Sequence, residues 1–221
     1  MSRNGPKQTL FTQFAVLAKA IAHPLRLELL EQLAQGERSV QRLADRIGMS
    51  VANASQHLRQ MHAAGLVTAR REEKFVLYSL ADPAVLELLA SLRRVAERND
   101  AKVKQVVQGY FEKRDAMEAV TRTELIDRYR QGLVTVLDVR PEDEFALGHL
   151  PDAINIPLEQ LSERLGDLSR SREIVAYCRG PYCVLSYEAV EMLRSKGFKV
   201  RRLEDGLPEW RQSGLPVATG V

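Results

Sequence analysis

Cys178 and Cys183 are the only two cysteines in the chain of 221 residues, and they stand five positions apart. An apolar run at residues 174–177 precedes Cys178 and is typical of a buried strand. A helical pattern begins at Val184, and between the cysteines lie Arg179, Gly180, Pro181 and Tyr182. In a strand–loop–helix of this kind, backbone N–H groups and the helix dipole favour a thiolate. The loop therefore predicts a sulfur nucleophile at Cys178, although a single cysteine is also typical of a buried core position.

Two other residues of this loop bear on the chemistry that Cys178 would perform. Arg179 either attracts an anionic substrate or simply faces solvent. Cys183 either offers a weak S–H donor or acts as a resolving thiol that attacks a sulfur group formed on Cys178. A disulfide between the two requires Cα atoms within about 7 Å, so the tightness of the loop decides whether it forms.

Helical and strand patterns alternate from Val120 onward. We expect strands at 134–138 and 200–203, a loop and short strand within 145–157, and helices at 121–131, around 158–165 and from 206. This alternation predicts a parallel sheet with helices on both faces. Ligands of such sheets bind beyond the carboxyl ends of the strands, and Cys178 lies at such an end.

The run Cys-Arg-Gly-Pro-Tyr-Cys resembles the active-site loop of the rhodanese family of sulfurtransferases. The likeness widens to residues 117–218 through LDVRPEDEFALGHLPDAINIP and LEDGLPEW. It implies that Cys178 carries sulfane sulfur from thiosulfate or a persulfide, in a loop formed by Arg179, Gly180, Pro181, Tyr182 and Cys183. Supporting roles in capping loops and holding the sheet edge are expected for Asp138, Arg140, Glu144, His149 and Asn155. Related arsenate-reductase and phosphatase loops are longer and close with an arginine, which argues for sulfur chemistry here.

The first half of the chain is basic and the second half is mildly acidic. Residues 1–115 carry 18 Lys and Arg against 12 Asp and Glu, a balance of +6. Residues 116–221 carry 14 against 17, a balance of −3. This asymmetry suggests that only the first half meets a polyanion. Ordinary surface charge could give the same balance, so the sequence motifs must distinguish a polyanion-binding surface from an ordinary one.

A helix-turn-helix pattern occupies this basic half. Helices are expected at 8–22, 24–34, 40–47 and 51–64, with Gly48-Met49-Ser50 as the turn before the last. Val51, Ala54, Leu58 and Met61 form the apolar face of that last helix. Its polar residues are Asn53, Ser55, Gln56, His57, Arg59 and Gln60. Amide and guanidinium groups read base edges in the major groove, although a solvated helix of a bundle also has such a face.

The residues after this helix favour the DNA-binding interpretation. Strands at 68–71 and 75–80 around the turn 72–74 predict a hairpin wing, with Arg70, Arg71 and Lys74 placed to contact phosphates. From AHPLRLELLEQL to KFVLYSL, the chain resembles the ArsR family of winged-helix repressors over roughly residues 8–100. The resemblance implies a homodimer on a palindromic duplex DNA operator, with the first and last helices at the dimer interface. Many members sense metals through cysteines that this half lacks, so we expect no metal site.

A long apolar stripe from Pro83 to Phe111 follows, with weak points at Asn99-Asp100 and Gly109. It predicts a helical connector that also serves as a dimer interface and ends in a stiff junction near 112–117. We therefore expect a mainly α winged helix-turn-helix domain at 1–100, a connector at 101–116 and an α/β rhodanese-like domain at 117–221.

Composition excludes several classes of protein. No apolar run reaches membrane-spanning length, the N-terminal residues lack a signal-peptide pattern, and two cysteines allow neither a disulfide framework nor a four-cysteine zinc site. We expect a cytoplasmic protein with reduced thiols and no cofactor. The function that these patterns favour is a repressor whose rhodanese-like domain carries or senses sulfane sulfur. The alternatives are a sulfurtransferase with an accessory DNA-binding domain and, third, arsenate reduction or arsenic sensing through the cysteine pair.

Overall fold

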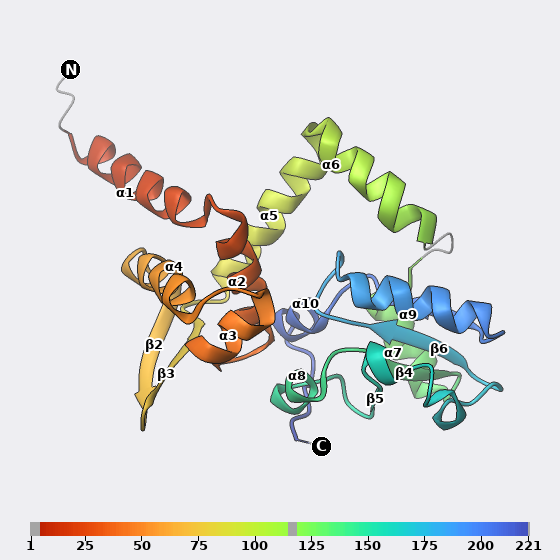
Figure 1. Cartoon of the computed structure of the whole chain (residues 1–221). Helices are drawn as coiled ribbons and strands as arrows, with labels where there is room; N and C mark the ends of the chain where they lie inside the picture. Colours follow the sequence, from red (N-terminus) through yellow and green to blue (C-terminus); the bar gives the residue numbers. More distant parts are fainter. Residues whose placement is uncertain (1–4, 115–118, 221) are drawn as a thin grey trace. The chain divides into compact units, whose positions relative to one another are not determined.

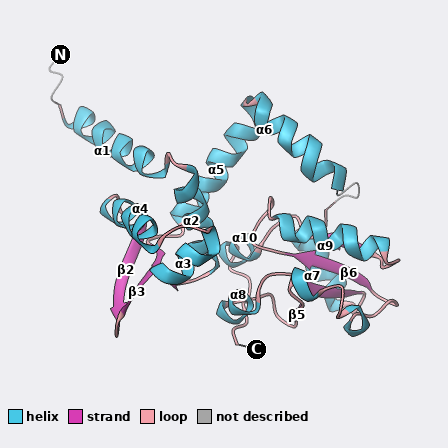
Figure 2. Ribbon diagram, viewed as in Figure 1, coloured by secondary structure: helices cyan, strands magenta, loops and turns pink. Residues whose placement is uncertain are grey.

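The computed structural model describes residues 5–114 and 119–220 (Figures 1 and 2). The chain forms two compact units, Met1–Leu89 and Ala90–Val221. The division falls inside the helix α5 (Ala84–Asn99). Part of the junction expected at 112–117 lies outside the described residues. The expected fold class is confirmed: a helical winged helix-turn-helix precedes a parallel α/β sheet.

The first unit begins with four helices whose ends follow the sequence signals. They are α1 (Pro6–Ile21), α2 (Pro24–Gln35), α3 (Val40–Ile47) and α4 (Val51–Ala63). The hydroxyl oxygens of Ser39 and Ser50 accept hydrogen bonds from backbone N–H groups in the first turns of α3 and α4. Gly48 ends α3 in the left-handed region at φ 69°, a conformation that glycine adopts without steric cost.

The wing is an antiparallel hairpin of β2 (Val67–Glu72) and β3 (Phe75–Leu80), visible beside α4 in Figure 1. Glu73 in the turn has φ 51°, as a tight hairpin turn requires. A third strand, β1 (Arg38–Ser39), pairs with β3 on its other side. The sequence did not predict β1, because two residues are too few to show a periodic pattern.

The core of the first unit gathers the apolar faces of α2, α3 and α4. Leu29, Leu43, Leu58 and Met61 are fully buried, and each such side chain stabilises the fold by about 1.5–3 kcal/mol. Val51 was expected on this face but is 43% exposed. The inward face of α4 therefore begins one turn later, at Ala54.

The connector consists of α5 (Ala84–Asn99), α6 (Ala101–Val106) and a π-helical segment, η1 (Val107–Glu112). The predicted break at residues 99–100 is confirmed. Asp100 caps α6, its carboxylate accepting hydrogen bonds from the N–H groups of Lys102 and Val103 at 2.8 and 3.2 Å. Gly109, the second predicted weak point, lies inside η1.

The second unit is built on a four-stranded parallel sheet in the order β5-β4-β6-β7. The strands are β4 (Val134–Asp138), β5 (Ile154–Asn155), β6 (Glu173–Tyr177) and β7 (Val200–Arg202). Its helices are α7 (Arg122–Arg130), α8 (Glu142–Leu147), α9 (Val184–Ser195) and α10 (Leu207–Gln212). Residues 145–147, expected as loop, end α8. The helix expected near 158–165 is replaced by two short 3-10 turns, η2 (Leu158–Gln160) and η3 (Leu165–Asp167).

Side chains of β6 alternate between two apolar layers. Ile174 and Ala176 pack with residues of α9, whereas Val175 and Tyr177 pack with residues of α7 and α10. The helices α9 and α7 flank the sheet in Figure 2. The same alternation sends Cys178 to the α9 face. No helix in the described residues is long and apolar enough to cross a membrane.

Candidate functional site

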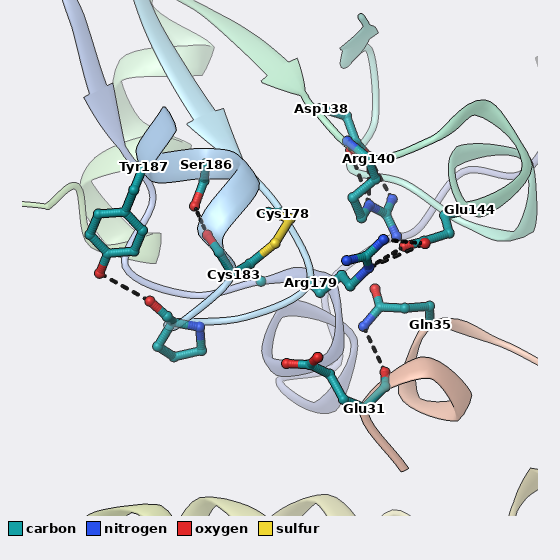
Figure 3. Close-up of a disulfide and its surroundings, with 12 residues drawn as sticks. Glu31, Gln35, Asp138, Arg140, Glu144, Cys178, Arg179, Cys183, Ser186 and Tyr187 are labelled. Atoms are coloured by element: carbon teal, nitrogen blue, oxygen red, sulfur yellow. Dashed lines mark hydrogen bonds and ion pairs between the residues drawn. A yellow bond between two sulfur atoms is a disulfide. The ribbon is translucent and has the colours of Figure 1, made fainter. Parts of the chain in front are cut away.

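The two cysteines lie at the carboxyl end of the central strand. Cys178 directly follows β6, and Cys183 directly precedes the first residue of α9. A disulfide joins them, with their Cα atoms 6.1 Å apart (Figure 3). This separation lies within the usual range for disulfides, so the loop has the tight curl that the sequence left open. In this form Cys178 is 1% exposed and Cys183 is 6% exposed.

Side chains of α9 hold one side of this loop. The hydroxyl of Tyr187 donates to the carbonyl of Pro181 at 3.0 Å, and the hydroxyl of Ser186 donates to that of Cys183 at 2.9 Å (Figure 3). Ser186 and Tyr187 are themselves buried. The loop is therefore fixed to the helix that follows it.

The segment before α10 holds the other side of the loop. The N–H of Leu207 donates to the carbonyl of Cys178 at 3.3 Å. A Cβ atom on Gly206 would overlap the backbone of Arg179 and Gly180. Only glycine permits this close approach, so α10 supports the first half of the loop directly.

Several loop amides remain available as donors. Within the described chain, the N–H groups of Gly180, Tyr182 and Val184 donate to no other backbone group, whereas that of Cys183 donates to the carbonyl of Gly180 at 3.1 Å. Unpaired amides in a loop that enters a helix favour a negative charge. This arrangement suits a sulfur anion on Cys178 in the reduced protein.

Arg179 forms a two-pronged ion pair with Glu144 of α8. Its Nε lies 2.9 Å from Oε2 and its Nη2 lies 2.7 Å from Oε1. Glu144 is fully buried, so the carboxylate balances the guanidinium charge. The expected attraction of an anionic donor by Arg179 is thus weakened, and the residue instead fastens the loop to α8.

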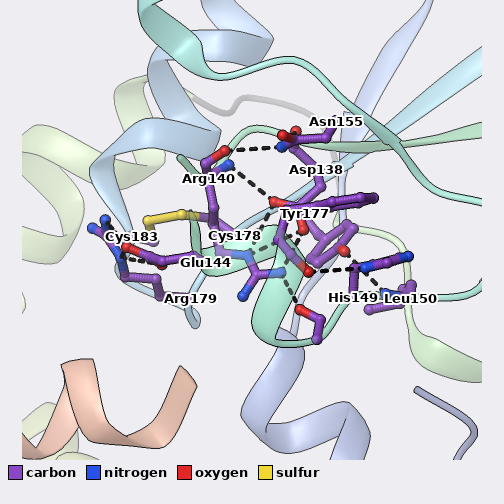
Figure 4. A network of polar contacts seen from close by, with 12 residues as sticks. Asp138, Arg140, Glu144, His149, Leu150, Asn155, Tyr177, Cys178, Arg179 and Cys183 are labelled. Carbon is purple, nitrogen blue, oxygen red and sulfur yellow. Dashed lines mark hydrogen bonds and ion pairs between the residues drawn. A yellow bond between two sulfur atoms is a disulfide. The ribbon is translucent and has the colours of Figure 1, made fainter. Parts of the chain in front are cut away.

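Asp138 and Arg140 form a fully buried ion pair at the end of β4 (Figure 4). Although burial disfavours its charge, the adjacent Asp138 carboxylate holds the pKa of Arg140 above its ordinary value. The same guanidinium donates to the carbonyl of Gly148 at 2.8 Å. Asn155 donates to the carbonyls of both members of the pair. Their geometry agrees with the supporting, structural role expected from the sequence.

The outer side of the loop contacts the connector, within the unit Ala90–Val221. Tyr182 donates its hydroxyl hydrogen to Oε1 of Glu97 on α5 at 2.7 Å, and its ring lies 5.0 Å from that of Phe111 in η1. Burial, together with this bond to Glu97, raises the pKa of Tyr182 above its ordinary value. Arg93 of α5 lies 5.7 Å from the centre of the Tyr182 ring.

Glu209 of α10 contacts both the segment before α10 and the connector. Its carboxylate accepts from the N–H of Gly206 at 3.1 Å and lies 3.7 Å from the guanidinium of Arg93. Burial raises its pKa. Sequence reasoning missed the loop partners Arg93, Glu97, Ser186, Tyr187 and Glu209. Only Glu209 carried a signal, since a glutamate three residues after a helix cap is typical of a capping box.

The structure leaves most of the expected DNA-facing residues of α4 accessible. Gln56 and Arg59 are exposed, and Asn53 and Ser55 are half-buried. His57 corrects the sequence interpretation, because it is only 9% exposed. Its Nδ1 accepts from Nε of Arg26 at 3.3 Å, and its ring lies 4.6 Å from that of His23.

His57 is therefore a buried residue. Burial, with His23 and Arg26 nearby, lowers its pKa. Gln60 is exposed, but its amide oxygen accepts from Arg26. In the part of the chain that is described, no cluster of three His, Cys, Asp or Glu could hold a metal ion.

The three basic residues of the wing differ in their partners. Arg70 is ion-paired with both Glu37 and Glu72, and the hydrogen bonds that it donates to these carboxylates raise its pKa. Arg71 donates only to a neutral acceptor, the carbonyl of Glu73, and Lys74 lies 5.4 Å from the ring of Phe75. The uncompensated positive charge of the wing therefore comes from Arg71 and Lys74.

Two family models match the chain, one in each half. Residues 23–69 match the model "Bacterial regulatory protein, arsR family", and residues 121–213 match "Rhodanese-like domain". The "HTH-type transcriptional regulator Rv0324" of Mycobacterium tuberculosis is 44% identical over 97% of this chain and 94% of its own length. The chain belongs to the ArsR family of transcriptional regulators. This regulator carries a rhodanese-like domain in addition to its helix-turn-helix.

Other similarities to the regulator cover one half at a time. A "Sulfurtransferase" of Allochromatium vinosum is 33% identical over 38% of this chain and 78% of its own. A homodimeric winged helix-turn-helix domain from Mycobacterium bovis matches 46% of this chain and 94% of its own with 36% identity and a TM-score of 0.42. A rhodanese-related protein from Thermoplasma volcanium matches 46% of this chain and 98% of its own, with 29% identity and a TM-score of 0.42.

Proposed function

We propose that this transcriptional regulator binds duplex DNA as a homodimer and that its DNA affinity depends on the sulfur state of the loop 178–183. The observation that carries the proposal is the Cys178–Cys183 disulfide at the end of β6. A thiol pair that can close into a disulfide has two stable chemical states. A regulator can use two such states as an input.

DNA recognition is assigned to α4 and to the wing. Asn53, Ser55, Gln56 and Arg59 lie on α4, where they offer amide, hydroxyl and guanidinium groups to base edges. Arg71 and Lys74 on the hairpin offer charge to phosphates. His57 is omitted from this surface because it is buried, and Gln60 must leave Arg26 to take part.

Self-association is assigned to the exposed apolar residues of α1. Leu10, Phe11 and Phe14 are 56%, 53% and 61% exposed. Exposed apolar side chains clustered on one helix are typical of a surface that another chain covers. A second copy is the proposed partner, because a two-fold dimer matches a palindromic DNA site.

Base reading by Gln56 gives a first prediction. Gln56→Ala should weaken binding to the preferred operator by about 1–3 kcal/mol and relax the base preference, because the amide that reads a base edge is lost. The measurement compares affinity for the operator and for duplexes with single base substitutions. Gln41→Ala, which removes an exposed glutamine of α3, is the matched control. An unchanged base preference in Gln56→Ala would remove this residue from the recognition surface.

The pairing of Arg70 gives a second prediction that separates it from its neighbour. Arg71→Ala should weaken binding to every DNA sequence alike and reduce the salt slope of the affinity by about 1. Arg70→Ala should change the slope less, because Arg70 must first leave Glu37 and Glu72. Salt titrations of the two variants with one duplex measure the difference. A larger change for Arg70→Ala would show that these ion pairs open on DNA.

The route from the loop to the DNA-binding half is assigned to α5. This helix begins in the first unit and ends in the second. Tyr182 lies in the loop between the two cysteines, and it contacts α5 through Glu97. Oxidation or sulfur loading alters the loop, and the contacts of Tyr182 with Glu97 and Phe111 then favour one of two arrangements of the connector.

A redox titration with and without DNA tests this proposal through thermodynamic reciprocity. If oxidation lowers DNA affinity, saturating DNA must favour the dithiol by the same free energy. For a two-electron couple, each tenfold difference in affinity per loop corresponds to a rise of about 30 mV in the reduction potential. An identical potential with and without operator would disprove the coupling.

A second candidate function is catalytic. The similarity to a sulfurtransferase of Allochromatium vinosum favours an enzyme whose DNA-binding half only places or regulates it. Two results together would favour this candidate over the regulator. One is steady thiocyanate production from thiosulfate and cyanide, and the other is a DNA affinity that is the same for the dithiol and disulfide states of the loop. Arsenate reduction or sensing has no comparable support, because the loop has the six-residue length of the rhodanese type.

A further inference from the structure

We infer that the loop 178–183 is a persulfide-reducing site: Cys183 expels the sulfur that Cys178 has accepted, as hydrogen sulfide. This inference rests on the proposed function, since it requires Cys178 to accept sulfane sulfur. It goes beyond sensing and beyond sulfur transfer to an acceptor. Its product is free sulfide, and its substrates are small persulfides and thiosulfate.

The folded loop places the sulfur atoms of Cys178 and Cys183 in bonding contact. The loop is fastened at several points, by Tyr187 and Ser186 from α9 and by Leu207 before α10. With these contacts in place, the Cα atoms of the two cysteines stand 6.1 Å apart and the sulfur atoms are bonded. Cys183 therefore reaches Cys178 in the folded loop, and attack within the loop benefits from high effective concentration.

The reaction has two balanced steps in the reduced protein. First, the Cys178 thiolate attacks the outer sulfur of thiosulfate, forms Cys178–S–S⁻ and releases sulfite. Second, the outer sulfur takes up a proton to give Cys178–S–SH, and the Cys183 thiolate attacks Sγ of Cys178. The bond to the outer sulfur then breaks, and hydrosulfide (HS⁻) leaves with the electron pair. The sulfane sulfur is reduced, and the two cysteine sulfurs are oxidised to the disulfide.

Burial favours this outcome over delivery of sulfur to a second protein. Cys178 and Cys183 are 1% and 6% exposed in the disulfide form, so a bulky thiol has poor access to the outer sulfur. Attack at Sγ of the protonated persulfide also expels hydrosulfide, a less basic leaving group than a cysteine thiolate, and thiol–disulfide exchange favours such leaving groups. A small-molecule dithiol reductant returns the loop to the thiol state.

The test follows both products in the reduced full-length protein without oxygen. Thiosulfate and a small organic persulfide are each added in one equivalent, and sulfite, sulfide and protein mass are measured. Thiosulfate releases sulfite in the first step, so sulfide from it arises only in the second. Wild type should release near one sulfide per chain and end as the disulfide. Cys183→Ser and Cys183→Ala should release no sulfide from thiosulfate and keep the added sulfur.

The outcomes separate this inference from the proposed function. If Cys183→Ser and Cys183→Ala gain a sulfur atom and wild type also keeps it without releasing sulfide, persulfide reduction is wrong and sulfur acceptance stands. The other outcome is that these variants gain no sulfur from either donor while their circular dichroism spectra and reduced-state DNA binding match wild type. In that case both persulfide reduction and sulfur acceptance by Cys178 are wrong. Two different substitutions at Cys183 guard against a local folding defect in one of them.

Discussion

Replacing Cys178 by serine is expected to abolish sulfur uptake. The Cys178 thiol is the proposed acceptor that forms an S–S bond with an incoming sulfur, and a serine hydroxyl cannot form such a bond. Thiocyanate formation from thiosulfate and cyanide should fall to the level of buffer alone. The DNA affinity of the reduced protein should stay near wild type, because Cys178 belongs to the second unit and α4 to the first.

The matched control is Cys183→Ser, which removes the other thiol of the same loop. It should still accept sulfur, since Cys178 and the amides of the loop remain. Mass spectrometry of each protein after thiosulfate treatment shows which residue gains the sulfur. Comparable sulfur loading of Cys178→Ser and wild type would exclude Cys178 as the acceptor.

Breaking the buried pair beneath the loop is expected to have the largest effect on stability. Asp138→Asn leaves the guanidinium of Arg140 buried without its carboxylate partner (Figure 4). Removing one partner of a buried ion pair typically costs about 3–5 kcal/mol of the free energy of unfolding. Trp210, the only tryptophan, is buried in this unit, so its fluorescence during urea unfolding measures the loss.

Asp167→Asn is the control for this substitution, because it makes the same chemical change in an exposed pair. The side chains of Arg164 and Asp167 are 38% and 50% exposed, and exposed pairs contribute about 0–1 kcal/mol. Its urea midpoint should therefore lie close to that of wild type. Equal losses for the two variants would mean that the network around Arg140 contributes little to stability.

Much of the architecture could be predicted from local signals. Ser39 and Ser50 marked helix starts, the apolar run before Cys178 marked the central strand, and Asp100 marked the break in the connector. These features depend on neighbours in sequence, which periodicity and capping residues report. Short elements such as β1, η2 and η3 were missed because so few residues leave no period to detect.

The parts of the sites that sequence could not provide all depend on distant residues. Glu144 and Arg179 are 35 positions apart, and Glu97 and Tyr182 are 85 apart. Nothing in the local pattern indicates such pairs, so the role of Arg179 was left open between attracting an anionic donor and facing solvent, and Glu97 was not singled out. The prediction that His57 faces DNA was wrong for a similar reason, because its burial depends on Arg26 and His23 from a different segment.

The coupling that the regulator requires is modest in energy. A tenfold loss of DNA affinity corresponds to about 1.4 kcal/mol, within the usual range of coupling between sites. The contacts of Tyr182 with Glu97 and Phe111 are of the kind that supplies such energies. Tyr182→Phe removes the hydroxyl bond and keeps the ring, so it separates these two contributions.

The most direct test of the central claim is operator affinity measured in defined states of the loop. Wild type is titrated with its operator as the dithiol and again after polysulfide treatment, with Cys183→Ser treated in parallel. We predict at least a tenfold weaker affinity for treated wild type and a clearly smaller change for Cys183→Ser, which cannot close the disulfide. Equal affinity in all states would contradict the account, because the two halves would then share a chain without communicating.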